Sequence, residues 1–246
     1  MGIDQVHVYS SETDADSGKS VVLGLKGLLP NLSIDGRAPF KTHCKISDYA
    51  YLCDSSKIKD VKQPFERHSS KANDSRLLYD GFVLQDMLRS HIPNSERDIG
   101  QLHIVLTNLL VCTFDVDDWR YHARPIVCGT PNLLSLPGIV EGPARPREYY
   151  LASMFGRKNR VQLDREFAGR FIAYQDARLY AAALGYAVQA IFYFITDGKP
   201  FCEDSGCRLH NTHWQEELIS AQVSNPVFCK LHLDMLNKFN STQNEN

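Results

Sequence analysis

The segment CEDSGCRLHNTHWQEELISAQVSNPVFCKLH, residues 202–232, contains two closely spaced pairs of metal-binding residue types. Four residues separate Cys202 from Cys207, and two residues separate Cys229 from His232. Zinc binds four thiolate or imidazole ligands in a tetrahedron, and two short pairs joined by a spacer supply such a set. The pattern therefore predicts a Zn²⁺ site formed by Cys202, Cys207, Cys229 and His232.

The residue types also indicate which kind of site this is. Three thiolates and one imidazole fill the coordination shell and leave no position for water or substrate, which is typical of structural zinc. Such an ion contributes roughly 10–16 kcal/mol, as much as the net stability of a whole domain. We therefore expect this end of the chain to fold only with its metal. The competing interpretation is that the three cysteines are ordinary buried apolar residues.

The fourth ligand has alternatives, because His210 and His213 lie in the spacer and either could replace His232. We favour His232 because it completes the second short pair. If residues 213–222 form a helix, His213 and Glu217 share one face and offer a weaker second metal site. A solvated contact between these two side chains is the commoner reason for that spacing.

Length, charge and cysteine content limit the class of protein. The 246 residues suffice for one large domain or two small ones, and the formal net charge of -2 gives no general attraction to nucleic acid or membrane. Seven cysteines, and no apolar secretory segment in MGIDQVHVYS, favour a reducing compartment, taken as the cytoplasm. Residues 179–196 approach the length of a membrane span, but we favour a buried core helix over membrane insertion.

Hydrophobic periodicity predicts an α/β (α+β) fold. Strands are expected at residues 3–9, 31–37, 102–107, 123–129 and 137–142, and helices at 18–29, 46–55 and 76–92. Helices are also expected at 147–156 and over a long region, 164–196, that ends at Asp197-Gly198. The predicted organisation is an α/β part at 1–146, a helical part with the zinc knot at 147–240, and a disordered tail at 241–246. The first two parts are expected to pack into one compact domain.

An acidic loop precedes the second half of the chain. Asp115, Asp117 and Asp118 lack the spacing of a calcium loop, so a solvated turn is the favoured interpretation. His122 follows this loop beside Trp119, and we expect it to be a packed histidine rather than a ligand.

The cysteine pattern resembles that of the archaemetzincins, which are metzincin-type zinc peptidases. In that family a helix bearing His-Glu-x-x-His-x-x-Gly-x-x-His runs into a Cys-x4-Cys pair, and a Cys-x-x-Cys pair follows after a spacer. Cys202 and Cys207 correspond to the first pair, and Cys229 and His232 to the second. Leu209 stands where the family has the methionine of its turn. The resemblance implies a metzincin-like mixed sheet with flanking helices, bound zinc and metallopeptidase ancestry.

The catalytic motif departs from that pattern. Counting back from Cys202, the positions of the three metal histidines and the general base hold hydrocarbon side chains, namely Ile191, Phe192, Ile195 and Phe201. Gly198 alone agrees with the motif. Hydrocarbon can neither bind zinc nor accept a proton from zinc-bound water. The resemblance therefore implies a degenerate catalytic site whose space is filled as core.

Two functional hypotheses follow. The favoured one is a metallopeptidase-like protein without activity, in which zinc fastens the helix end and the former cleft binds a peptide or protein partner. The alternative is an active hydrolase whose displaced metal is held by some of His122, His210, His213, Glu216 and Glu217. Nucleic-acid binding through Arg208 and Lys230 is disfavoured because acidic neighbours cancel their charge. We expect neither a nucleic acid nor a membrane as partner.

Overall fold

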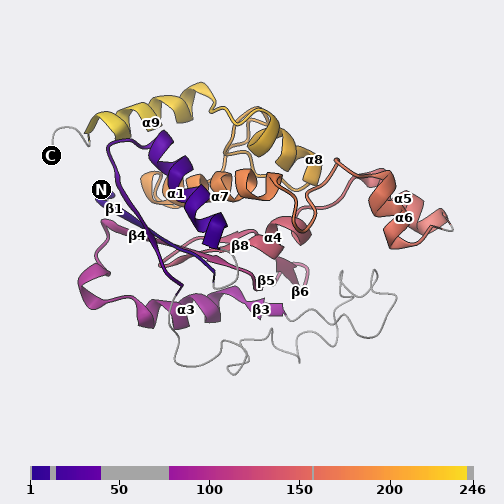
Figure 1. Cartoon of the computed structure of the whole chain (residues 1–246), viewed down its shortest axis with the longest axis horizontal. Coiled ribbons are helices and arrows are strands. Elements are labelled where there is room, and N and C mark those ends of the chain that lie inside the picture. Colours follow the sequence, from indigo (N-terminus) through magenta and orange to yellow (C-terminus); the bar gives the residue numbers. More distant parts are fainter. Residues whose placement is uncertain (1, 12–14, 40–77, 157, 243–246) are drawn as a thin grey trace.

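The computed structural model describes residues 2–11, 15–39, 78–156 and 158–242. The helix expected at residues 46–55 and most of the tail at 241–246 lie outside the described residues. The fold is a mixed α/β arrangement with two sheets, as the sequence predicts (Figure 1).

The larger sheet has five strands in the order β2-β1-β4-β8-β7. The strands are β1 (Gln5–Tyr9), β2 (Ser33–Arg37), β4 (Gln101–Thr107), β7 (Ile126–Val127) and β8 (Asn132–Ser135). All neighbours pair in parallel except β7, which is antiparallel to β8 at the edge. The smaller sheet, in the order β3-β5-β6, contains β3 (Leu78–Asp80) and the hairpin of β5 (Leu110–Asp115) and β6 (Arg120–Ala123).

One face of the larger sheet is apolar and is covered by two helices, α1 (Ala15–Leu28) and α7 (Arg178–Ile195) (Figure 1). Val6 and Val8 of β1 and Ile104 of β4 are fully buried on this side. The two helices approach closely, since a Cβ atom on Gly24 would lie 2.3 Å from Leu184 Cδ2. The alternating valines expected at residues 3–9 thus point into the main core.

Helix α7 is the one helix of the described residues that is long and apolar enough to cross a membrane. Of its 18-residue window, 61% is buried inside the protein. Ala183, Ala187 and Phe192 are among the side chains that it contributes to the main core. The all-round apolar sequence is therefore explained by a helix with protein on most of its surface.

The helix expected at residues 76–92 begins at Gly81 in the structure. Residues 78–80 form β3, and α3 spans Gly81–His91. The carboxylate of Asp80 accepts hydrogen bonds from the N–H groups of Phe82 and Val83, at 3.0 and 3.2 Å, and so caps the helix. A Cβ atom on Gly81 would lie 2.8 Å from Val111, so the glycine permits the close approach of α3 to β5.

The strand expected at residues 137–142 is wrong, because this segment forms α4 (Leu136–Glu141). The hydroxyl of Ser135 accepts a hydrogen bond from the N–H of Gly138 at 2.9 Å, and a proline occupies the first turn. Both features favour a helix start. Local capping therefore outweighs the strand propensity of Ile139 and Val140.

The long helical region expected at 164–196 is interrupted. The chain forms α5 (Arg147–Phe155) and α6 (Arg160–Glu166), then turns before α7. Gly169 and Gln175 both have positive φ, at +87° and 67°, which no helix accommodates. Arg178 stabilises the turn by donating to the carbonyl groups of Gly169 and Phe171 at 2.7 and 2.8 Å.

The C-terminal segment returns to the start of the chain. After α8 (Gln215–Leu218) and a π-helical turn, η4 (Ile219–Ser224), the last helix α9 spans Lys230–Thr242. Asn31 donates to the carbonyl of Asn240 at 2.9 Å, and Asn240 donates to the carbonyl of Leu28 at 3.1 Å. The last turn of α9 is therefore fastened to the end of α1.

Candidate metal centre

The four side chains predicted as zinc ligands lie together. Cys202 and Cys207 belong to the loop after α7, Cys229 immediately precedes α9, and His232 lies in its first turn. Their ligand atoms are all within 4.8 Å of one another. The Sγ atoms of Cys202 and Cys229 are 3.9 Å apart, and Nδ1 of His232 lies 3.7 Å from Cys207 Sγ and 3.1 Å from Cys229 Sγ.

These separations fit a zinc ion. With Zn–S bonds of about 2.3 Å and Zn–N bonds of about 2.0 Å, the ligand atoms of a tetrahedral site lie roughly 3.5–3.8 Å apart. The backbone also suits a thiolate, because the N–H groups of Leu209 and Cys229 point at Cys207 Sγ from 3.5 and 3.4 Å. The donor set and its surroundings therefore fit zinc.

The pKa shifts of the four side chains differ in direction, and only those of Cys229 and His232 favour the form that binds a metal. Burial raises the pKa of Cys202 to about 12 and also raises the pKa of Cys207. Burial acts on Cys229 too, but the backbone N–H of His232 and the two neighbouring thiols hold its pKa below the usual value. Burial lowers the pKa of His232, which favours the neutral imidazole that a metal ligand requires. A divalent cation would replace the thiol protons.

The alternative fourth ligands face elsewhere. Nδ1 of His210 donates to the carbonyl of Cys202 at 3.2 Å. His213 precedes α8, so the expected helical face shared by His213 and Glu217 does not form. The carboxylate of Glu217 instead accepts hydrogen bonds from the N–H groups of His213 and Trp214, at 2.9 and 3.1 Å, and caps α8. Of the three histidines considered, His232 is the one beside the thiols.

Helix α7 contacts the cysteine cluster through an aromatic bridge. The ring of Phe192 stacks on Phe228 with centroids 5.8 Å apart, and it meets His232 edge-on at 5.5 Å. Ile191 and Phe192 are fully buried, as expected for side chains that replace catalytic groups. Phe201 is different, because 43% of it is exposed, so the expectation that it fills the core is wrong. The chain has already left α7 at the Asp197-Gly198 turn, where both residues have positive φ.

The chain is similar to known proteins in sequence and in fold. The sequence profile of a family described as "Probable metallopeptidase family (DUF6775)" matches residues 2–239, so the chain belongs to this family. A zinc-dependent peptidase from Methanocorpusculum labreanum has a similar fold, with a TM-score of 0.53, 12% sequence identity, and coverage of 94% of this chain and 100% of that chain. No curated protein matches the sequence. Membership of a metallopeptidase family and the Cys/His cluster together indicate a metal cofactor.

A second cluster of potential ligands lies on the other face of the larger sheet. His7 of β1 is in register with Asp35 of β2 and with His103 of β4, and both histidines are buried. Sequence reasoning missed these residues. The signal was available, because a histidine flanked by apolar residues occurs in both QVHVY and QLHIV, but it required knowledge of which strands pair.

Every ring nitrogen of this second cluster has a protein partner. His7 Nδ1 lies 2.5 Å from Asp35 Oδ1, and His7 Nε2 lies 2.7 Å from Gln101 Oε1. For His103, Nδ1 is 3.1 Å from the hydroxyl of Tyr9, and Nε2 donates to the carbonyl of Glu96 at 2.8 Å.

A guanidinium completes this network. Arg37 binds Glu96 with both terminal nitrogens, at 2.5 and 3.1 Å, and donates from Nε to Asp35 at 2.9 Å. These pairs hold the pKa values of Asp35 and Glu96 below their usual range, although burial opposes the shift. Because a cation already bridges the carboxylates, we interpret the network as a link between strands rather than a metal site.

The network makes stability sensitive to acid. Burial lowers the pKa of His103, so the unfolded chain binds its proton more readily than the folded chain. The contribution of His103 is therefore complete above about pH 6.5 and is lost as the pH falls below that value. We expect the free energy of unfolding to fall between pH 7 and pH 5, and His103→Gln to flatten this dependence. Urea denaturation at a series of pH values measures the free energy of unfolding of both proteins.

The exposed His91→Gln is the matched control for His103→Gln. It should leave the slope of stability against pH unchanged. An unchanged slope in the His103→Gln variant would show that this imidazole is not responsible.

A third cluster, Asp115, Asp118 and His122, lies on the hairpin of β5 and β6. The expectation that His122 is a packed histidine is wrong. Nε2 of His122 lies 3.0 and 2.9 Å from the two oxygens of Asp118, which also pairs with Arg120, and the ring is partly exposed. Asp115 accepts a hydrogen bond from the N–H of Asp117 at 2.9 Å, as in the expected solvated turn.

Proposed function

We propose that this protein is a non-catalytic, archaemetzincin-like member of its metallopeptidase family. In this proposal Cys202, Cys207, Cys229 and His232 hold one structural zinc ion, and the fold serves to bind a peptide or protein partner. The observation that carries the proposal is the composition of α7, the helix that leads into the cysteine cluster. It presents the buried hydrocarbon of Ile191 and Phe192 where a peptidase of this type requires imidazole and carboxylate.

The chemistry of the cysteine cluster supports a structural role. A catalytic zinc needs an open coordination position and a base for its water, whereas four protein ligands close the shell. Zinc bound here would cross-link the loop after α7 to the first turn of α9. Three thiol ligands also require a reducing environment, which supports the cytoplasm as the proposed location.

The alternative of an active hydrolase with a displaced metal has less support. The described residues do not bring His210, His213 and Glu217 into one group of potential ligands. Glu217 caps α8, and Glu216 pairs with Arg170 at 2.7 Å. Each of these two carboxylates has a structural partner that a metal would have to displace.

Metal content and peptidase activity test the proposal together. We expect mass spectrometry of purified protein to give one zinc per chain, because one closed ligand set is present. A fluorogenic peptide library with added zinc should show no chelator-sensitive turnover. Two zinc ions per chain, with turnover that is lost in His213→Ala and kept in His91→Ala, would establish the active alternative instead.

A further inference from the structure

Helices α5 and α6 form a lobe that projects from one end of the molecule (Figure 1). The lobe has its own small core, formed by Tyr149, Leu163, Phe167 and Phe171. Arg145 lies over the rings of Tyr149 and Phe171, at 4.7 and 4.3 Å, and closes this core. The lobe is therefore stabilised from within by its own side chains.

The outer face of α5 carries an apolar stripe. Leu151, Met154 and Phe155 follow the i, i+3, i+4 spacing of one helix face, and Met154 and Phe155 are 74% and 81% exposed. Val161, which follows on α6, is also exposed. Anchors at this spacing are the means by which a helix binds an apolar surface of a partner, and such a group on a soluble surface marks an interaction site.

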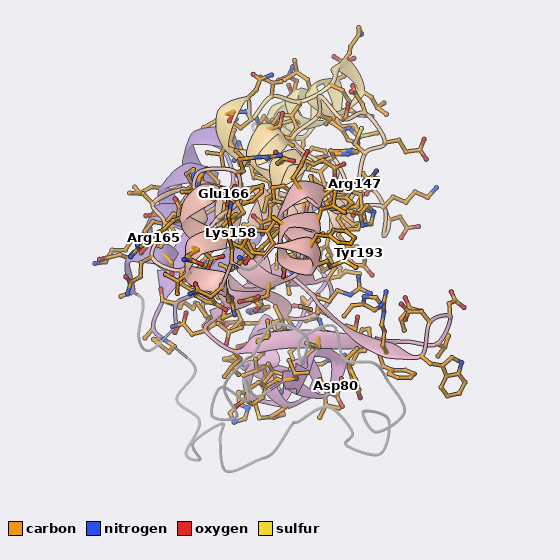
Figure 2. All side chains as sticks on the ribbon, turned by 90° about the vertical axis from the view of Figure 1, so that its right-hand side faces the viewer. Asp80, Arg147, Lys158, Arg165, Glu166 and Tyr193 are labelled. Atoms are coloured by element: carbon orange, nitrogen blue, oxygen red, sulfur yellow. The ribbon has the colours of Figure 1, made fainter. Side chains whose placement is uncertain are left out.

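The lobe is also basic. Residues 145–170 contain seven Arg or Lys and three Asp or Glu, a net charge of +4 within a chain of net charge -2. Figure 2, which looks onto this end of the molecule, shows Arg147, Lys158 and Arg165 around the lobe. Arg165 lies one turn after Val161 and, within the described residues, has no ion-pair partner. A complementary surface would be apolar and acidic.

The chain itself carries a surface of that kind. At the tip of the β5–β6 hairpin, Val116 and Trp119 are 68% and 70% exposed, and they alternate with Asp115, Asp117 and Asp118. Trp119 has a positive φ of 54° and touches Phe114 edge-on, with ring centroids 6.1 Å apart. Most of the indole is therefore available to a partner.

We propose that the α5–α6 lobe of one copy binds the β5–β6 hairpin tip of a second copy of this chain. The apolar stripe would meet Val116 and Trp119, and Arg165 would face the carboxylates of the tip. Because each copy carries both surfaces, a two-fold arrangement would use the contact twice. This self-association does not depend on the zinc or on the absence of catalysis.

A lipid surface is a weaker candidate for this face. Even a myristoyl chain by itself gives only marginal membrane binding, so α5 and α6 are not expected to hold a membrane by their apolar residues alone. A protein surface of matching charge adds specificity that an array of lipids lacks.

Sedimentation velocity over a concentration series tests the proposal. The wild-type chain should shift from monomer to dimer as its concentration rises, and 0.5 M salt should weaken the association because opposite charges meet. Phe155→Ser and Trp119→Ser should each raise the dissociation constant about tenfold or more, as expected for loss of an interface anchor. Leu23→Ser is the matched control, since Leu23 is 71% exposed on α1, and it should leave the constant unchanged.

Charge reversal identifies the pairing. Asp117→Lys and Arg165→Glu should each weaken the dimer, and a mixture of the two variants should associate more tightly than either alone. A monomer at all concentrations up to 0.2 mM would overturn the proposal. Binding to phosphatidylserine vesicles that Phe155→Ser abolishes, without self-association, would also overturn it and would assign the face to a membrane.

Discussion

Cys207→Ser is expected to lose bound zinc and the cooperative unfolding of the C-terminal part together. Cys207 is buried, and its sulfur accepts hydrogen bonds from two backbone N–H groups. A serine hydroxyl binds zinc more weakly than a thiolate does, and its oxygen is smaller than the sulfur. Structural zinc contributes about 10–16 kcal/mol, which is comparable to the roughly 5–15 kcal/mol of net stability of a typical domain. Zinc content by mass spectrometry and thermal unfolding by circular dichroism measure the two losses.

Cys128→Ser is the matched control for Cys207→Ser. Cys128 is a half-buried thiol whose pKa burial raises to about 12, but it belongs to none of the groups of potential metal ligands in the described residues. It should keep one zinc per chain with a loss of stability of about 0.5–3 kcal/mol, the usual range for a point mutation. A folded Cys207→Ser variant without metal would contradict the zinc assignment.

Phe192→Ala is expected to lower the free energy of unfolding by about 3–5 kcal/mol, the usual cost of removing a fully buried phenylalanine. The same substitution should weaken zinc binding, because the ring of Phe192 packs against both Phe228 and the imidazole of His232. Urea denaturation in excess zinc measures the first effect, and competition with a chromophoric chelator measures the second.

Leu23→Ala provides the comparison, since Leu23 is 71% exposed and its substitution should change stability by no more than about 0.5 kcal/mol. If Phe192→Ala lost stability while keeping the zinc affinity of the wild type, α7 and the metal centre would be independent. The contact of Phe192 with Phe228 and His232 would then be a packing contact that does not influence zinc binding by His232.

Local patterns account for the parts of the fold that the sequence predicts well. Val6 and Val8 alternate because they point into the main core, while His7 and Tyr9 are buried on the other face of β1. The apolar residues of 179–196 are continuous because α7 is enclosed. Predictions fail where a single side chain outweighs the pattern. The cap at Ser135 converts an expected strand into α4, and Asp80 delays the start of α3.

The candidate metal centre is predictable because its ligands occur as two local pairs. Choosing His232 over His210 needs the tertiary structure, in which His210 turns to the carbonyl of Cys202. The network of His7 and His103 is beyond sequence reasoning for a related reason. Its contacts join positions as far as 94 residues apart, and only the strand order β2-β1-β4 shows that they meet.

Helix α9 links two distant parts of the molecule. Its first turn supplies His232 to the cysteine cluster, and its last turn exchanges hydrogen bonds with the end of α1, 209 positions earlier in the chain. If the cluster holds zinc as proposed, loss of the ion would therefore loosen α9 as a whole and not only the loop that carries Cys202 and Cys207. Loosening of α9 would expose the backbone amides of α1 to exchange with solvent. Zinc binding near the C-terminus would then affect the stability of the N-terminal part of the chain.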